Sequence, residues 1–287
     1  MQSRPIFIIV VLVLILVFQI QAPKPDIPKS GALASATGAN TLRPEKPLPA
    51  IEAGAAFAEN FITGEILYEK NSSYPMPLAS LTKIISSLTA LDFISLDEEI
   101  KTKNGAHFKV RDILAMIMVE SSNGAVETLF NHVVEKNNIN PEEAKNWFLN
   151  LMFKKAELFG GRGDGMIFST IDGVDTSENS AGAMGSARGI MQIAKSSLDS
   201  PLWQFGAIHE VISKDGLIYP LNPTNALEKE IPGLIGAKTG LTDLAGGNLL
   251  IIFEHPLGRP IGIVVLGSTQ TGRFEDTKKI YEWIKSR

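Results

Sequence analysis

The 287-residue sequence contains no cysteine, which excludes disulfides, thiolate metal sites and a cysteine nucleophile. Histidine is also scarce, and His107, His132, His209 and His255 form no pair with the spacing of zinc ligands. No long run of Lys or Arg is present and the formal net charge is -4, so a nucleic-acid partner has little support. We therefore expect neither a metal ion nor another cofactor.

The longest apolar run lies near the N-terminus, where residues 6–18 are continuously apolar and follow the basic residue Arg4. The run fits the hydrophobic region of a signal peptide and is shorter than the roughly 20 residues that span a bilayer unaided. Ile20 occupies a position where cleavage requires a small side chain, which favours an uncleaved anchor. We expect residues 1–22 to form a signal peptide or an N-terminal membrane anchor, with the rest of the chain exported.

Residues 23–49 hold six of the sixteen prolines and almost no large apolar side chains, as is typical of a semi-extended linker. Residues 50–287 have the composition of one globular domain. Its two ends have strand patterns and its middle has helical periodicity, which predicts an α+β fold. We expect an antiparallel β-sheet flanked by helices, together with a helical subdomain.

The expected sheet pairs a hairpin near the start of the domain with strands near its end. The turn of that hairpin is at Gly64. The pattern predicts strands at residues 55–61, 64–70, 234–240, 247–253 and 261–268, and helices at about 80–93, 110–136, 141–158, 186–198 and 274–286.

The segment MPLASLTKIISSL, residues 76–88, places Lys83 three positions after Ser80 at the start of an apolar helix. On a helix this spacing makes the two side chains neighbours, on the edge of the buried face. A desolvated lysine near a helix N-terminus has a lowered pKa, and a neutral amine beside a hydroxyl is a base beside a nucleophile. Alone, the motif is also explained by a helix-capping serine followed by a solvated lysine.

Two further motifs follow in order. Ser121, Ser122 and Asn123 interrupt a helical run, and such residues also occur at simple helix breaks. Lys238 and Thr239 precede Gly240 on an otherwise apolar strand, where a lysine can also protect a sheet edge from aggregation.

The ordered set Ser-x-x-Lys, Ser-x-Asn and Lys-Thr-Gly is a known signature of penicillin-binding proteins and class A β-lactamases. The chain resembles the low-molecular-mass penicillin-binding proteins, the serine D-Ala-D-Ala carboxypeptidases. The resemblance extends to TGEILYEKNSSYPMPLASLTK, SARGIMQIAKSS and GSTQTGRFEDTKKIYEWI and covers about residues 50–287. It implies a β-lactamase/transpeptidase-like fold, peptidoglycan stem peptides as substrates and β-lactams as covalent inhibitors. It also implies a site of action on the extracytoplasmic face of a bacterial membrane or in the periplasm.

The resemblance also implies catalytic roles. Ser80 would be the acylated nucleophile and Lys83 its general base. Ser121 would relay the proton to the leaving amine, and the Asn123 amide would hold Lys83 and the substrate carbonyl.

The remaining roles implied by the resemblance concern substrate binding. Lys238 and Thr239 would bind the terminal carboxylate, and Gly240 would leave room for a peptide along the strand. The backbone N–H groups of Ser80 and Leu241 would form the oxyanion hole. Arg273 matches a family arginine near the carboxylate end, but it also fits a surface charge at a helix start.

Three alternatives stay open beside the carboxypeptidase: a D,D-endopeptidase, a class A-like β-lactamase and a sensor that is acylated without turnover. A β-lactamase would need a deacylating glutamate in a Glu-x-x-Asn loop. Glu143 and Asn146 have that spacing. However, Asn140 followed by Pro141 and two acidic residues is how a helix begins, which favours the structural explanation.

Overall fold

The computed structural model describes residues 47–161 and 165–287. The expected signal peptide or anchor and all but the last three residues of the linker lie outside these ranges. Within them, no helix is both long enough and apolar enough to cross a membrane.

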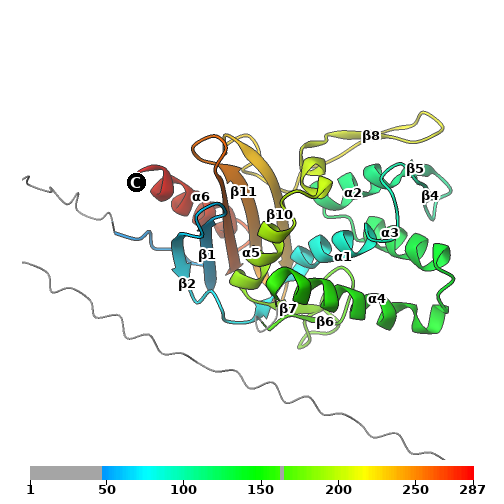
Figure 1. The fold of residues 1–287 in the computed structure, drawn as a ribbon, viewed down its shortest axis with the longest axis horizontal. Coiled ribbons are helices and arrows are strands. Elements are labelled where there is room, and N and C mark those ends of the chain that lie inside the picture. Colours follow the sequence, from blue (N-terminus) through cyan, green and yellow to red (C-terminus); the bar gives the residue numbers. More distant parts are fainter. Residues whose placement is uncertain (1–46, 162–164) are drawn as a thin grey trace, which may run out of the picture. The chain divides into compact units, whose positions relative to one another are not determined.

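A five-stranded antiparallel sheet is the centre of the domain, with the strand order β10-β11-β12-β1-β2 (Figure 1). The expected pairing of the first hairpin with the last strands is therefore confirmed. The hairpin turns at Gly64, whose φ of 71° favours glycine. The strands are β1 (Ala55–Asn60), β2 (Ile66–Lys70), β10 (Leu234–Thr242), β11 (Gly246–Glu254) and β12 (Pro260–Ser268).

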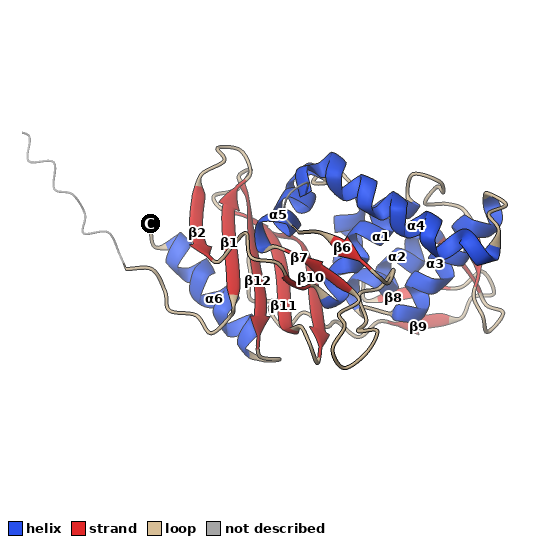
Figure 2. Cartoon of the chain, turned by 90° about the horizontal axis from the view of Figure 1, so that it is seen from below, coloured by secondary structure: helices blue, strands red, loops and turns tan. Residues whose placement is uncertain are grey.

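Helices cover both faces of this sheet (Figure 2). Alternate side chains point to opposite faces: Leu250 and Ile252 pack with α5 (Ala187–Ser196), whereas Leu249 and Ile251 pack with α6 (Gly272–Lys285). This two-sided burial explains why β11 and β12 read as nearly continuous apolar runs.

The helical region is built around α1 (Thr82–Ala90), in which every residue is buried. The helices α2 (Val110–Val119), α3 (Asn123–Lys136) and α4 (Pro141–Ala156) pack against it. The expected helix over residues 110–136 is thus two helices, separated at residues 120–122. Ser121 makes the break with a φ of 60°, and the Ser122 hydroxyl caps α3 by accepting a hydrogen bond from the Ala125 N–H.

Short elements that the sequence pattern did not predict connect these layers. They are β3 (Met76–Pro77), η1 (Ala79–Leu81), β4 (Glu99–Lys101), β5 (His107–Lys109), η2 (Glu157–Gly161), β6 (Ile167–Phe168), β7 (Ala183–Gly185), η3 (Pro201–Ala207), β8 (Glu210–Ile212) and β9 (Ile218–Pro220).

The two ends of the domain are joined by Asp276 of α6, which is only 1% exposed. Its carboxylate accepts hydrogen bonds from the backbone N–H groups of Glu52 and Ala53, at 3.1 and 2.9 Å. It also accepts one from the Ser268 hydroxyl at 2.8 Å. This buried carboxylate therefore holds α6, β12 and the segment that leads into β1 together.

Replacing Asp276 with Ala leaves three donors without their acceptor, and the hydrogen bonds of two of them, the Ala53 N–H and the Ser268 hydroxyl, are buried. We expect this change to lower the free energy of unfolding by about 2–4 kcal/mol. The matched control is Glu275→Ala, because Glu275 is exposed on the same helix, and its expected effect is within about 0.5 kcal/mol. Urea unfolding followed by circular dichroism measures both. Equal stability of the two variants would contradict this account of the fold.

Candidate active site

Ser80 and Lys83 are brought together by the turn η1 and the first turn of α1. The Lys83 Nζ donates a hydrogen bond to the Ser80 Oγ at 2.7 Å and another to the backbone carbonyl of Asp172 at 2.9 Å. The Lys83 side chain is fully buried, whereas Ser80 is half-buried and reachable. The structure thus places an amine against a hydroxyl that a substrate can approach.

Burial lowers the pKa of Lys83 from 10.5 to about 8, although the nearby Asp172 carboxylate opposes the shift. About a tenth of the amine is therefore neutral at pH 7, against well under a thousandth for a lysine with the ordinary pKa. Only the neutral form has the lone pair that can accept the Ser80 proton.

Lys238 lies opposite this pair on β10, at the edge of the sheet. Its Nζ donates hydrogen bonds to the Ser121 Oγ at 2.6 Å and to the Thr239 carbonyl at 2.9 Å. The second and third motifs therefore meet directly, although 117 residues separate them. Lys238 is only 1% exposed, so it is not a solvated charge that protects the sheet edge.

The pKa of Lys238 is lowered well below its ordinary value. Burial is the largest cause, and the positive charges of Lys83 and Arg273 lower it further. No carboxylate is within hydrogen-bonding distance of Lys238 in the described part of the chain. An anionic ligand would supply the missing negative charge and favour the ammonium form.

Gly240 lets β10 pack closely against the turn that carries Ser80. A Cβ at this position would lie 3.0 Å from the Leu78 carbonyl oxygen and 3.2 Å from the Ala79 Cβ. The next residue, Leu241, is 44% exposed on the open edge of the strand. An extended peptide therefore has access to the strand edge beside Ser80.

Arg273 is buried at the start of α6 and is not a surface charge. Its Nη1 donates to the Gly240 carbonyl at 2.7 Å, which ties the helix to the strand of the third motif. Its Nε is buried without a partner among the described residues, and burial lowers the pKa of its guanidinium. Arg273 thus adds positive charge behind β10.

Asn123 does not make the expected contact with Lys83. In the described part of the chain the Lys83 amine instead donates to Ser80 and Asp172. Asn123 is exposed at the first position of α3. It lines a cavity of about 330 Å³ whose walls also include Glu127, Phe130, Lys145 and Asp172. A contact between Asn123 and a substrate carbonyl stays a prediction.

Two parts of the chain that shape the site were not expected from the sequence. The first is the loop of residues 169–182, whose Asp172 carbonyl accepts a hydrogen bond from Lys83. Gly173 allows the loop to lie there, since a Cβ on it would be 1.9 Å from the Ala79 carbonyl oxygen, and its φ is 80°. Asp175 fixes the other end of the loop by accepting from the Thr242 hydroxyl and the Leu244 N–H, both at 3.1 Å.

The second missed group is Asn248, a fully buried residue of β11. Its amide donates to the Pro77 carbonyl at 2.9 Å and accepts from the Gly267 N–H at 2.8 Å. It therefore attaches the segment before Ser80 to the sheet. A buried polar residue within an apolar strand was the available signal in the sequence.

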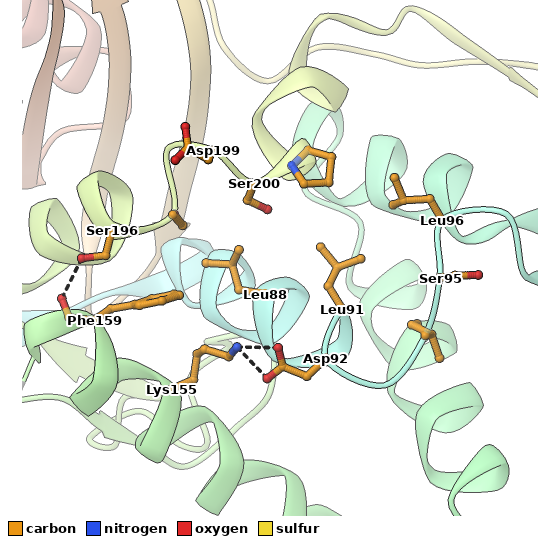
Figure 3. Close-up of a pocket in the computed structure, with 13 residues that line it drawn as sticks. Leu88, Leu91, Asp92, Ser95, Leu96, Lys155, Phe159, Ser196, Asp199 and Ser200 are labelled. Atoms are coloured by element: carbon orange, nitrogen blue, oxygen red, sulfur yellow. Dashed lines mark hydrogen bonds and ion pairs between the residues drawn. The ribbon is translucent and has the colours of Figure 1, made fainter.

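Figure 3 shows a second cavity, of about 410 Å³, at the opposite end of α1. Leu88, Leu91 and Phe159 line it, and Lys155 pairs with Asp92 at 2.6 Å on its wall. Ser80 and Lys83 lie at the start of α1, about three turns away. None of the residues that line this cavity belongs to the candidate active site.

Glu143 occupies the first turn of α4 and is exposed there. Asn140 caps this helix by accepting a hydrogen bond from the Glu142 N–H at 3.0 Å. The structural explanation of this motif is therefore confirmed.

Comparisons with known proteins identify relatives of the chain. No protein-family model matches the sequence. The chain is 24% identical over 260 residues to a D-alanyl-D-alanine endopeptidase of Escherichia coli, covering 83% of this chain and 79% of the relative. It is 23% identical over 260 residues to the D-alanyl-D-alanine carboxypeptidase DacC of the same organism, covering 82% of this chain and 62% of the relative.

Among solved structures, penicillin-binding protein D2 of Listeria monocytogenes in its ampicillin-bound form matches with a TM-score of 0.69 and 26% identity. The match covers 83% of this chain and 99% of that protein. Together with the curated relatives, it shows that the chain has the fold of the low-molecular-mass penicillin-binding proteins and resembles the D-alanyl-D-alanine peptidases in sequence.

Proposed function

We propose that the protein is an exported serine D-alanyl-D-alanine carboxypeptidase that removes the terminal D-Ala of peptidoglycan stem peptides through an acyl-enzyme on Ser80. The observation that carries the proposal is the buried Lys83 amine, 2.7 Å from the Ser80 hydroxyl. As in the sequence analysis, the N-terminal segment would be a signal peptide or a membrane anchor.

Acylation begins when the neutral Lys83 amine takes the Ser80 proton and the Ser80 oxygen attacks the substrate carbonyl. The backbone N–H groups of Ser80 and Leu241 stabilise the oxyanion that forms. When the intermediate collapses, the leaving amine receives a proton through the Ser121 hydroxyl. Water then attacks the ester carbonyl. The bond to Ser80 breaks, one water proton passes to the Ser80 oxygen, and the shortened peptide leaves with a free carboxyl group.

The carboxylate of the leaving residue meets a cluster of positive charge. Lys238 and Arg273 supply this charge, and the Thr239 hydroxyl lies on the same strand. The Asn123 amide, exposed on the α3 side, would hold the carbonyl of the penultimate residue.

Endopeptidase action on cross-linked stem peptides is the second candidate, because the curated relatives include D-alanyl-D-alanine endopeptidases. The same nucleophile, base and carboxylate site would serve both reactions.

The first test incubates the full-length protein with a fluorescent penicillin and, separately, with a pentapeptide that ends in D-Ala-D-Ala. It measures how long the label stays on the protein and how much D-Ala is released. We expect slow loss of the label, with release of D-Ala from a pentapeptide. Ser80→Ala should lose both labelling and release, whereas Ser73→Ala, a change at an exposed serine nearby, should keep both. A cross-linked dimer as substrate measures endopeptidase action.

Three outcomes would contradict the carboxypeptidase. Rapid loss of the label would indicate a β-lactamase. Retained label without any D-Ala release would indicate a sensor. Cleavage of the dimer without release of D-Ala from the pentapeptide would indicate a pure endopeptidase.

The second test is the pH dependence of acylation. Because only neutral Lys83 acts as the base and its pKa is about 8, the acylation rate should rise with pH up to about pH 8 and level off above it. Well below this pKa the expected slope is about tenfold per pH unit. Stopped-flow labelling with penicillin measures the rate.

Lys83→Arg should abolish acylation at every pH, because a guanidinium stays protonated. Lys154→Arg, at an exposed position on α4, should keep the wild-type profile. A rate that does not change between pH 6 and pH 8 would contradict the role of Lys83.

A further inference from the structure

Thr224, in the segment that follows β9, lies between the second and third motifs. Its backbone N–H and its hydroxyl both donate to the Val119 carbonyl, at 3.0 and 2.9 Å. Its hydroxyl oxygen also accepts a hydrogen bond from the Thr239 hydroxyl at 2.7 Å. Thr224 thus joins the end of α2, just before Ser121, to the strand that carries Thr239.

The direction of these hydrogen bonds follows from counting hydrogens. The Val119 carbonyl can only accept, so the single hydroxyl hydrogen of Thr224 is used in donating to it. Thr239 must therefore donate its own hydroxyl hydrogen to Thr224. In the free protein, both hydroxyl dipoles point towards Val119.

This arrangement is the reverse of the one that a carboxylate needs. A carboxylate only accepts hydrogen bonds, so Thr239 must turn its hydrogen towards the ligand in order to bind it. Thr224 can then donate to the Thr239 oxygen. The Val119 carbonyl still accepts from the Thr224 N–H, so the reversal leaves none of these groups without a partner.

We propose that Thr224 is a positioning residue for recognition of the substrate's terminal carboxylate, and that carboxylate binding reverses the Thr239–Thr224–Val119 hydrogen-bond chain. This inference rests on the proposed function. In the reversed chain two hydroxyl dipoles are aligned towards the anion, which strengthens the bond that Thr239 donates. A neutral C-terminal amide gains less binding free energy from Thr224, because its NH2 group can donate to the Thr239 oxygen without any reversal of the chain.

The test compares a D-Ala-D-Ala peptide acid with its C-terminal amide as substrates of the full-length protein. In Thr224→Val we expect the preference for the acid, as a ratio of kcat/KM values, to fall about fivefold, since one supporting hydrogen bond is lost. The fall should come from a higher KM for the acid with little change in kcat. Thr224→Ser keeps a hydroxyl and should restore the wild-type preference.

The matched control is Thr102→Val. The Thr102 hydroxyl also has a backbone carbonyl acceptor, that of Ala106 at 2.9 Å, beside the Asn104 side-chain oxygen, but it lies in the turn between β4 and β5. The preference of Thr102→Val for the acid over the amide should equal that of the wild type.

Two results would overturn the role of Thr224. One is an unchanged or higher acid preference in Thr224→Val. The other is an equal loss of kcat/KM for both substrates, which indicates only a structural role. D-Ala release by the wild-type protein in the same assay tests the proposed function separately.

Discussion

The candidate active site depends on one contact, the hydrogen bond between the fully buried amine of Lys83 and the half-buried hydroxyl of Ser80, one helical turn away. Lys83 lies in α1, the helix in which every residue is buried. Removal from water, rather than a neighbouring cation, is the main cause of its lowered pKa. The elements packed around α1 therefore help to lower the pKa of this amine. The loop of residues 169–182 helps to hold the amine in place, because its Asp172 carbonyl accepts a hydrogen bond from it.

The same burial opposes folding at neutral pH. The pKa of Lys83 is about 8 in the folded protein, against an ordinary value of 10.5. Between these values the unfolded chain binds more protons than the folded one, so the contribution of this group to stability rises with pH. Below pH 8 the folded state carries the full penalty of a buried ammonium. The apolar sheet core and the buried Asp276 carboxylate contribute stability that offsets this penalty.

The sequence predicted those elements that are determined by residues close together in the chain. The apolar runs of β11 and β12 and the periodicity of α1 each show directly in a short window of residues. The three motifs identified Ser80, Lys83, Ser121 and Lys238, and the structure gathers them around β10 and the start of α1. The break at Ser121 was visible because polar residues interrupt an apolar helix.

What the sequence could not predict comes from contacts between distant segments. Nothing near Asp172 indicates that its carbonyl accepts from Lys83, 89 residues earlier in the chain. The expected contact of Asn123 with Lys83 failed for the same reason, since this carbonyl and Ser80 accept from the amine instead. Asn248 and Thr224 likewise gain their roles only when the sheet and the helical region are assembled.

The most direct test of the account is to titrate the Lys83 amine itself. Carbon-13 NMR of the full-length protein labelled at the lysine Cε atoms gives one titration curve per lysine, and the signal missing in Lys83→Arg identifies the curve of Lys83. We predict a midpoint near pH 8. A midpoint near 10.5 would show that the amine is solvated and charged at neutral pH, and would contradict its role as the base for Ser80.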